Sequence, residues 1–445
     1  MKRLSALFLL PVLVFGQELS WPPKLPGGKL VDSGSSPKLL KISSKLRSGV
    51  TVAKVAPLVD FLYYPAQDYP GNPWSVWGES LCWGEKYYSS IGDHKGPEGN
   101  SFLYEYDAKA RKIRVLADLR RVLGLPKGHY TPGKIHSRID MGKDGWLYYS
   151  THRGSTRVTT TKHHFKGGWI LRTHPDTAKT EIVSHAPLPM QTLPASVLDP
   201  DSMIFYAGTA DGDYKNNRVQ FLAYDLKRRK VLYSDDNGFS RYAIFAKSTG
   251  LLYFHDGRST PGQTEGPRSL VRFDPSRPGK PSSIGAKLGL RAATGELSTG
   301  KVYTIDHDEL WEFDVRTETA RSLGSSAVAS KTYTTSIDAD HSTNRYLYYV
   351  PGAHGGAELD GSPLVQYDLK TRTRKVICFL HPYLYDKFGF IPLGTFGSAV
   401  SLTGEKVYVT WNGNRGTPCE KLGSRAKFNT CGMTVVHIPL QERSP

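Results

Sequence analysis

The sequence predicts an all-β chain folded as a seven-bladed β-propeller, on three observations. Its 445 residues include 44 Gly, 29 Pro and 25 Tyr, a composition that favours short strands joined by turns. A short, mostly Tyr-rich strand returns seven times, at roughly the 40–50-residue spacing of propeller repeats, stretched where loops grow. In most copies an aliphatic strand that ends in Tyr-Asp or Phe-Asp follows it. The alternative fold, a pair of β-sandwiches, predicts no such period.

Each repeat is interpreted as one four-stranded antiparallel blade. Its second strand is expected at 86–90, 146–150, 203–207, 251–254, 301–305, 346–350 and 406–410. Its third strand is expected at 103–107, 169–172, 222–225, 270–274, 310–314, 364–368 and, in degenerate form, 435–438. Short turns that contain Gly, such as 142–145 and 403–405, join neighbouring strands. Because one blade cannot bury both faces of its sheet, seven blades are expected to pack around an axis.

The two ends of the chain are expected to close this ring together. The last strand, at 433–439, is predicted to join a blade whose outer strand comes from within 50–63. The expected organisation is a signal peptide, a partly irregular extension, a single propeller domain and a tail. Their boundaries are 1–16, 17–49, 50–440 and 441–445.

The first residues have the features of a secretory signal peptide. Basic Lys2 and Arg3 precede the apolar run 4–15, which is too short to span a bilayer, and small Gly16 offers a cleavage site. The alternative is a buried N-terminal helix. No other apolar stretch approaches the ~18 residues of a membrane span. We therefore expect a secreted or periplasmic protein.

The charge of the mature chain predicts an anionic partner. Without Lys2 and Arg3, the 58 basic residues fall to 56 against 41 acidic ones, a formal net charge of +15. Such a surface attracts polyanions. For an exported chain, an acidic polysaccharide or another polyanion of the envelope is favoured over nucleic acid. The alternative is that the charge only aids solubility, and the oligomeric state stays open.

Cysteine usage predicts one disulfide and no haem. Cys419 and Cys431 flank a basic insertion and are expected to pair in an oxidising compartment, whereas Cys82 and Cys378 are expected to be buried and unpaired. The sequence has no Cys-x-x-Cys-His haem motif, no Gly-x-Ser-x-Gly elbow and no nucleotide-binding signature. The cofactor is therefore undefined, and a divalent metal is an option that no motif selects.

Topology predicts which face of the propeller carries the function. The second-to-third loops and the blade-to-blade connections of four-stranded blades lie on one face, and here they are long. They include 152–168, 209–219, 255–268, 351–363 and 412–432, with connections at 118–133, 185–193 and 380–394. Long loops on a rigid scaffold usually carry binding and catalysis. The site is therefore expected at the axial depression of this loop-rich face.

The run 128–138 enters an innermost strand from that face. His136 and Arg138 are two residues apart and so share one side of the strand. His152 and Arg153 follow the next strand and should reach the same rim. Two histidines and two arginines predict an anion site with a titratable partner. The alternative is that they form hydrogen bonds that pack one blade against the next.

Similar positions in other blades complete the set of candidate residues. The candidate catalytic residues are two bases and two acids: His136, His152, Tyr130 and Tyr333. The candidate substrate-binding residues are Arg138, Arg153, Arg241, His129, His255, His354 and Trp411.

This pattern of strands resembles the superfamily of secreted bacterial propellers over residues 72–439. That superfamily includes the YVTN and quinoprotein-like families, the streptogramin lyases, and the ulvan and oligogalacturonate lyases. The resemblance implies a seven-bladed fold, and it makes polysaccharide lyase chemistry possible on such a scaffold. No catalytic motif of any of these families is matched, and fold alone does not define function.

Two classes of function follow from these observations. The first is an exported lyase that cleaves an acidic polysaccharide by β-elimination: arginines neutralise the uronate carboxylate, a histidine takes the adjacent proton, and a tyrosine protonates the leaving oxygen. The second is a non-catalytic module that binds a glycan, a small anion or a protein. Side chains that converge on one position favour the enzyme, and scattered ones favour the module. A redox propeller with a quinone cofactor is a third option without a motif.

Overall fold

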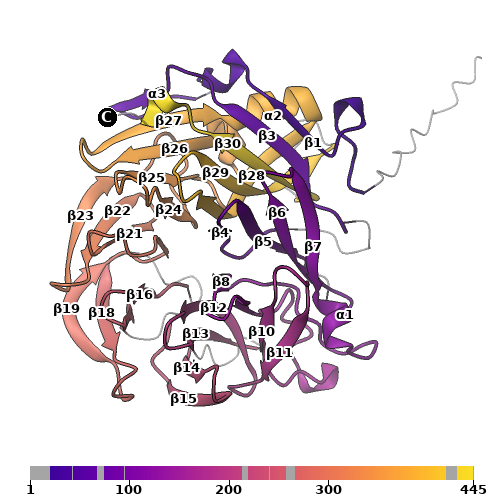
Figure 1. Cartoon of the computed structure of the whole chain (residues 1–445), viewed down its shortest axis with the longest axis vertical. Helices are drawn as coiled ribbons and strands as arrows, with labels where there is room; N and C mark the ends of the chain where they lie inside the picture. The colour runs from indigo at the N-terminus through magenta and orange to yellow at the C-terminus, as the bar shows by residue number, and fades with distance from the viewer. Residues whose placement is uncertain are drawn as a thin grey trace, which may run out of the picture.

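Seven β-sheets form a ring around one axis in the computed structural model of the chain (Figure 1). The residues that the structure describes are 21–42, 44–67, 75–94, 96–212, 219–239, 241–256, 266–416 and 428–443. The predicted all-β, seven-bladed propeller is therefore confirmed. The predicted signal peptide at 1–16 lies outside the described residues.

Each blade begins with its innermost strand and is built outward in chain order. Blade 1 comprises β4 (Leu81–Trp83), β5 (Lys86–Gly92), β6 (Ser101–Asp107) and β7 (Lys112–Asp118); blade 2 comprises β8 (Asp140–Met141), β9 (Leu147–Ser150), β10 (Trp169–Thr173) and β11 (Thr180–His185). Blade 3 comprises β12 (Gln191–Asp199), β13 (Ile204–Asp211), β14 (Phe221–Asp225) and β15 (Lys230–Asp235); blade 4 comprises β16 (Ile244–Ala246), β17 (Leu251–His255), β18 (Arg268–Phe273) and β19 (Ser282–Leu288). Blade 5 comprises β20 (Ala292–Ala293), β21 (Lys301–Asp306), β22 (Glu309–Asp314) and β23 (Thr319–Ser325).

The last two blades each gain strands from the N-terminal segment. Blade 6 comprises β24 (Ile337–Ala339), β25 (Tyr346–Tyr349), β26 (Pro363–Asp368), β27 (Thr373–Phe379) and the added β2 (Val50–Val52). Blade 7 comprises β28 (Phe390–Val400), β29 (Lys406–Arg415), β30 (Thr430–His437) and the added β3 (Leu58–Tyr63) and β1 (Val31–Gly34).

The aspartate that ends most third strands closes the outer turn of its blade. Its carboxylate accepts a hydrogen bond of 2.7 to 3.0 Å from a backbone N–H two or three residues later. This arrangement recurs at Asp107, Asp225, Asp274, Asp314 and Asp368. An aspartate that binds the following backbone in this way stabilises a turn. The Tyr/Phe-Asp repeat of the sequence is therefore a signal of the fold rather than of the function.

Ring closure is composite, as predicted. β3 pairs antiparallel with β30, from Leu58 opposite His437 to Tyr63 opposite Gly432. β1 then pairs antiparallel with β3, and β2 pairs in parallel with β27. These additions cover strand edges whose N–H and C=O groups would otherwise be unpaired. The N-terminal segment thereby holds blades 6 and 7 together.

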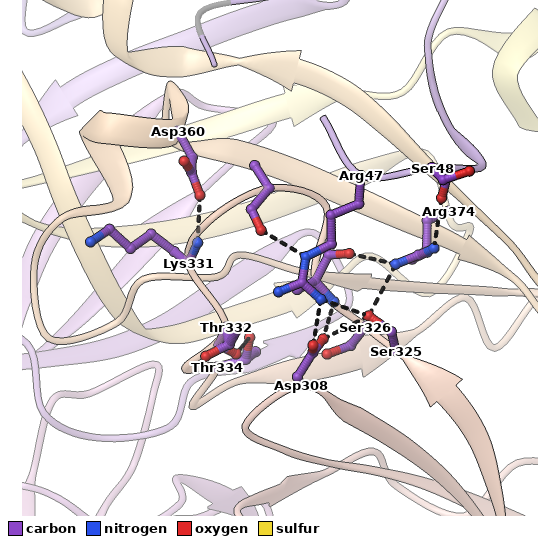
Figure 2. A network of polar contacts seen from close by, with 12 residues as sticks. Arg47, Ser48, Asp308, Ser325, Ser326, Lys331, Thr332, Thr334, Asp360 and Arg374 are labelled. Carbon is purple, nitrogen blue, oxygen red and sulfur yellow. Dashed lines mark hydrogen bonds and ion pairs between the residues drawn. The ribbon is translucent and has the colours of Figure 1, made fainter. Parts of the chain in front are cut away.

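A polar network fixes the segment before β2 to blades 5 and 6 (Figure 2). Arg47 forms an ion pair with Asp308 and donates a hydrogen bond to the Ser325 hydroxyl at 3.1 Å. Arg374 donates to the Ser48 carbonyl at 3.2 Å and to the same Ser325 hydroxyl at 3.1 Å. Residues of two blades and of the N-terminal segment therefore share one set of hydrogen bonds.

Short helices occupy the connections and the chain ends. They are η1 (Pro26–Gly28), η2 (Pro37–Leu40), α1 (Leu119–Leu123), η3 (Thr161–His163), η4 (Ala357–Asp360), α2 (Leu380–Phe388) and α3 (Leu440–Arg443). Over the described part of the chain, no helix is long and apolar enough to cross a membrane.

The cysteines lie in the packed blades. Cys82 and Cys378 are buried free thiols, as predicted. Cys431 is buried in β30, but Cys419 lies outside the described residues. The disulfide between these two residues is therefore not shown and stays a prediction.

Removal of the Arg47 side chain is expected to loosen the N-terminal segment. Arg47→Ala should lower the free energy of unfolding by roughly 1–2 kcal/mol, because it deletes a partly exposed ion pair and several hydrogen bonds. Denaturant unfolding measures this change. As a control, Arg277→Ala removes an exposed ion pair to Asp274 (3.5 Å) and should cost less than about 0.5 kcal/mol. Equal losses in the two variants would contradict the anchoring role of Arg47.

Candidate functional site

The axial site is built from residues at the start of the innermost strands. Before and into β8, Lys134, His136, Arg138 and Asp140 are partly exposed, whereas the three residues between them are buried. Alternate residues of an extended chain point to opposite sides. These four side chains therefore face the axis in order from the loop-rich face to the opposite face. Other blades contribute Trp77, Ala195, Arg241, Arg291 and Phe396 at the depth of His136.

The site is strongly cationic. The Lys134 ammonium lies 4.1 Å from the centroid of the Trp77 ring. Arg291 is only 6% exposed and donates from Nε to the Tyr333 hydroxyl at 2.8 Å. Burial, and then repulsion from Arg153 and Arg241, lowers the pKa of Lys134 to about 7. Among the described residues, neither Lys134 nor Arg291 has a carboxylate partner at ion-pair distance.

Two histidines at this site have defined tautomers. His136 Nδ1 lies 2.9 Å from the Pro194 carbonyl oxygen, which can only accept, so this nitrogen carries the proton. His152 Nδ1 lies 2.9 Å from the Thr192 hydroxyl, which donates its own proton to the Ala210 carbonyl at 3.0 Å. His152 Nδ1 must therefore donate as well. In both neutral rings Nε2 holds the lone pair, and the ring centroids are 5.4 Å apart.

The surrounding cations keep these imidazoles neutral. Burial lowers the pKa of His136 and His152 well below the usual range, and the charges of Lys134 and Arg241 lower both further. Desolvation and then Arg291 and Arg241 lower the pKa of His354 to about 4. The histidines of the site are therefore neutral rather than charged anion ligands near neutral pH.

Aromatic rings from blades 1, 6 and 7 form a continuous wall beside the cations. We use "aromatic wall" for Trp77, Phe396, His354 and Tyr333, whose successive ring centroids are 4.9, 5.2 and 4.7 Å apart. Such a wall can pack against the apolar face of a ligand ring.

Blade 6 holds Tyr333 in place from outside the site. The Asp360 carboxylate accepts a hydrogen bond from the Lys331 backbone N–H at 2.6 Å (Figure 2) and one from the Ser330 hydroxyl at 2.8 Å. The Tyr333 carbonyl accepts a hydrogen bond from the Gly352 N–H at 2.8 Å. These bonds fix the backbone on both sides of the ring.

Below the histidines, the axis is closed by a layer that we call the septum: Glu79, Arg138 and Tyr242. Arg138 donates to the Asp140 carboxylate at 3.2 Å and to the Tyr242 hydroxyl at 2.6 Å, and Tyr242 donates to the Ala293 carbonyl at 2.7 Å. Burial raises the pKa of Glu79 to about 7, although Arg138 opposes the shift. The space above the septum is about 10 Å³, close to the room that one water molecule needs.

The structure brings most of the predicted site residues to this cluster. His136, His152 and Arg241 meet near the axis, and Tyr333 and His354 belong to the aromatic wall. Arg138 lies in the septum, where other side chains already occupy its guanidinium. Arg153 is 2% exposed and lies beside His152, donating to the Thr192 hydroxyl at 3.3 Å.

Four predicted residues lie outside the axial cluster. Tyr130 is buried between Phe165 and Trp169, and Trp411 is fully buried in β29, where its Nε1 donates to the Thr434 hydroxyl at 2.9 Å. His129 stacks on His164 at 4.0 Å in the loops of blade 2. His255 Nε2 lies 2.8 Å from the Leu288 carbonyl and so packs blade 4 together.

The sequence-based assignment missed Lys134, Arg291, Trp77 and Glu79. A signal for Lys134 was present, because it precedes His136 by two residues and therefore shares its side of the strand. Arg291 directly precedes β20 at a place similar to that of Arg241 ahead of β16. Trp77 and Glu79 precede β4 with the same two-residue spacing. A search of the residues at the start of each innermost strand would therefore have found these four.

Comparison with known proteins shows the fold. No known protein family matches the sequence, and no match is found among curated protein sequences. An oligogalacturonate lyase in complex with manganese matches in structure with a TM-score of 0.51 at 12% identity, over 91% of this chain and 98% of that one. The oligogalacturonate lyase from Vibrio parahaemolyticus matches with a TM-score of 0.50 at 9% identity, over 93% and 98%. At these identities the likeness is one of fold alone, and by fold the chain is a seven-bladed β-propeller.

Proposed function

We propose that the chain is an exported enzyme that cleaves a uronate-containing polysaccharide by β-elimination at the axial cluster. The observation that carries the proposal is the gathering of Lys134, Arg241 and Arg291 around neutral histidines. Like charges held together in a partly buried site repel one another and lower the stability of the folded chain. A bound carboxylate offsets that repulsion, which makes an anionic group the natural ligand of this site.

The aromatic wall adds a preference for a ligand with an apolar ring face. A uronate sugar carries such a face together with a carboxylate on the same ring. The ring is placed against Trp77 and Phe396, and the carboxylate points toward Lys134 and Arg291. Since the space beside His136 is about 10 Å³, only the edge of the ring that bears the carboxylate and the adjacent C–H approaches His136.

The residues of the site can supply each step of an elimination. The cations neutralise the uronate carboxylate and so make the adjacent C–H bond more acidic. His136 Nε2 takes that proton, the electron pair forms the new C=C bond, and the bond to the glycosidic oxygen breaks. Tyr333 protonates the leaving oxygen, because its hydroxyl accepts from Arg291 and keeps its own proton to donate. His152, with its ring 5.4 Å from that of His136, is the second candidate base.

The residues present do not fit a divalent metal. One structural neighbour holds manganese, which is a property of that protein. Within the described ranges, no group of three or more His, Cys, Asp and Glu side chains is arranged to hold a metal ion. The histidines here are enclosed by Lys134, Arg241 and Arg291, whose charge repels a cation. No step of the mechanism is therefore routed through a metal.

The two oligogalacturonate lyases support the class of reaction that is proposed, because their fold carries lyase chemistry on nearly the same length of chain. Likeness of fold does not select a substrate. The runner-up function is a propeller that binds the same acidic glycan without cleaving it. Retention of the glycan with no formation of product would favour that module.

Loss of the proposed base should abolish cleavage while the fold persists. His136→Ala is expected to lower kcat by roughly 100-fold or more on polygalacturonate or another polyuronate, because general base catalysis typically contributes that much. The ultraviolet absorbance of the unsaturated uronyl product measures the rate, with a chelator present throughout. His174→Ala, in the turn after β10, serves as the matched control and should retain full activity. Full activity in both His136→Ala and His152→Ala would contradict the proposed mechanism.

The affinity of the site for a uronate should fall as pH rises through about 7. Lys134 has its pKa lowered to about 7, so its positive charge is present below that pH and is lost above it. Glu79 has its pKa raised to about 7 and gains negative charge over the same interval. From one pH unit below this shared pKa to one unit above it, the dissociation constant for galacturonate should rise roughly tenfold. Calorimetric titration measures this rise.

A variant separates the contribution of Lys134 from that of Glu79. Arginine keeps its charge at every pH in this range, so Lys134→Arg should flatten most of the pH dependence. Glu79→Gln should leave only the part of the pH dependence that is due to Lys134. An unchanged pH profile in Lys134→Arg would exclude Lys134 as the titrating carboxylate ligand.

A further inference from the structure

The axis also opens on the opposite face, into a cavity of about 180 Å³. The septum separates it from the axial cluster, because Glu79, Arg138 and Tyr242 line both spaces. The cavity therefore lies on the face of tight turns, for which the sequence predicted no function.

The lining of this cavity is ordered from a polar base to an apolar mouth. Glu79, two residues before β4, and Leu81 are partly exposed, whereas Trp83 at the end of β4 is exposed, so Glu79 lies deepest and Trp83 at the mouth. Leu402, in the turn after β28, lines the cavity with Trp83. Trp83 is 54% exposed and Leu402 is 56% exposed, although both are large apolar side chains.

The base of the cavity presents acceptors. One oxygen of Glu79 accepts a hydrogen bond from the Ser336 hydroxyl at 3.3 Å, and the other accepts none from a described residue. Asp338 accepts from the Val400 N–H at 2.8 Å and contributes a second, partly exposed carboxylate to the lining.

The positive charge nearest these carboxyl groups is already engaged. Arg138 donates to Asp140 and to the Tyr242 hydroxyl, and both of these bonds lie within or beside the septum. His341 lies at the mouth, 4.0 Å from the Asp338 carboxylate, with 38% of its side chain exposed. In a chain whose formal net charge is +17, this cavity is lined by two carboxyl groups, one guanidinium and one imidazole.

We propose that this cavity binds a small organic cation, a primary ammonium that carries a short apolar chain. The ammonium group lies between Glu79 and Asp338 and donates hydrogen bonds to their carboxylates. The apolar chain packs against Trp83 and Leu402 at the mouth of the cavity. The proposal does not depend on the lyase function, although Glu79 lies between the two sites and lines both.

Calorimetric titration of the whole protein with n-butylammonium tests the proposal, at a pH above the Glu79 pKa of about 7. The matched probe n-butanol has the same apolar chain and no charge. Butylammonium is expected to bind at least roughly tenfold more tightly than butanol, because charge-assisted hydrogen bonds add to the apolar contact. Absence of binding heat, or equal affinity for the two probes, would overturn the proposal.

Two variants assign the binding to this cavity. Asp338→Asn keeps an acceptor for the Val400 N–H but removes the charge, and it should weaken butylammonium binding by roughly tenfold. Trp83→Ala should weaken it by about threefold or more, and the exposure of Trp83 means that the fold tolerates the change. Ile182→Ala removes an apolar side chain that is 42% exposed on β11, and it should leave the affinity unchanged. Thermal melts confirm that each variant is folded, and unchanged affinity in both cavity variants would refute the assignment.

Discussion

Closure of the ring is the constraint on which the axial site depends. The pairing of β3 with β30 joins the two ends of the folded chain and leaves no open gap between blades 7 and 1. Once the ring is closed, the innermost strands face one another, and every second residue of each points to the same axis. A residue that is ordinary within its own strand thereby meets residues from blades that lie far away in the sequence. Lys134 and Arg291 are 157 positions apart by their numbers, yet both act on His136.

The fold could be predicted because its signals are local and repeat. The aspartates at the ends of the third strands each bind the backbone of the next turn, so the Tyr/Phe-Asp pattern marks a real structural unit. The composite closure could be predicted as well, because one more strand was needed to complete blade 7. The parallel pairing of β2 with β27 could not be predicted, because it follows from the path of the N-terminal segment and from contacts such as the Arg47–Asp308 ion pair. Neither leaves a repeating mark in the sequence.

The site could be predicted only in part. The sequence near a residue indicates its position along a strand, but its distance from the axis depends on how all seven blades pack. His136 and His152 were found because both lie at the loop-rich end of strands near the axis. Tyr130 lies in the same stretch of sequence, yet the chain turns it into the packing of Phe165 and Trp169, where an aromatic side chain buries more apolar surface.

Charge along the axis changes sign from one face to the other, and the septum explains how both ends can persist. Lys134 and its neighbours hold the loop-rich end positive, whereas Glu79 and Asp338 give the opposite end its carboxyl groups. Without a barrier these charges would pair along the channel and leave neither end able to bind an ion. Arg138 contributes to this barrier, because its guanidinium donates to Asp140 and Tyr242 in the layer between the two ends. Arg138 is therefore held within the septum between two oppositely charged ends, and these contacts oppose its direct use as a substrate ligand.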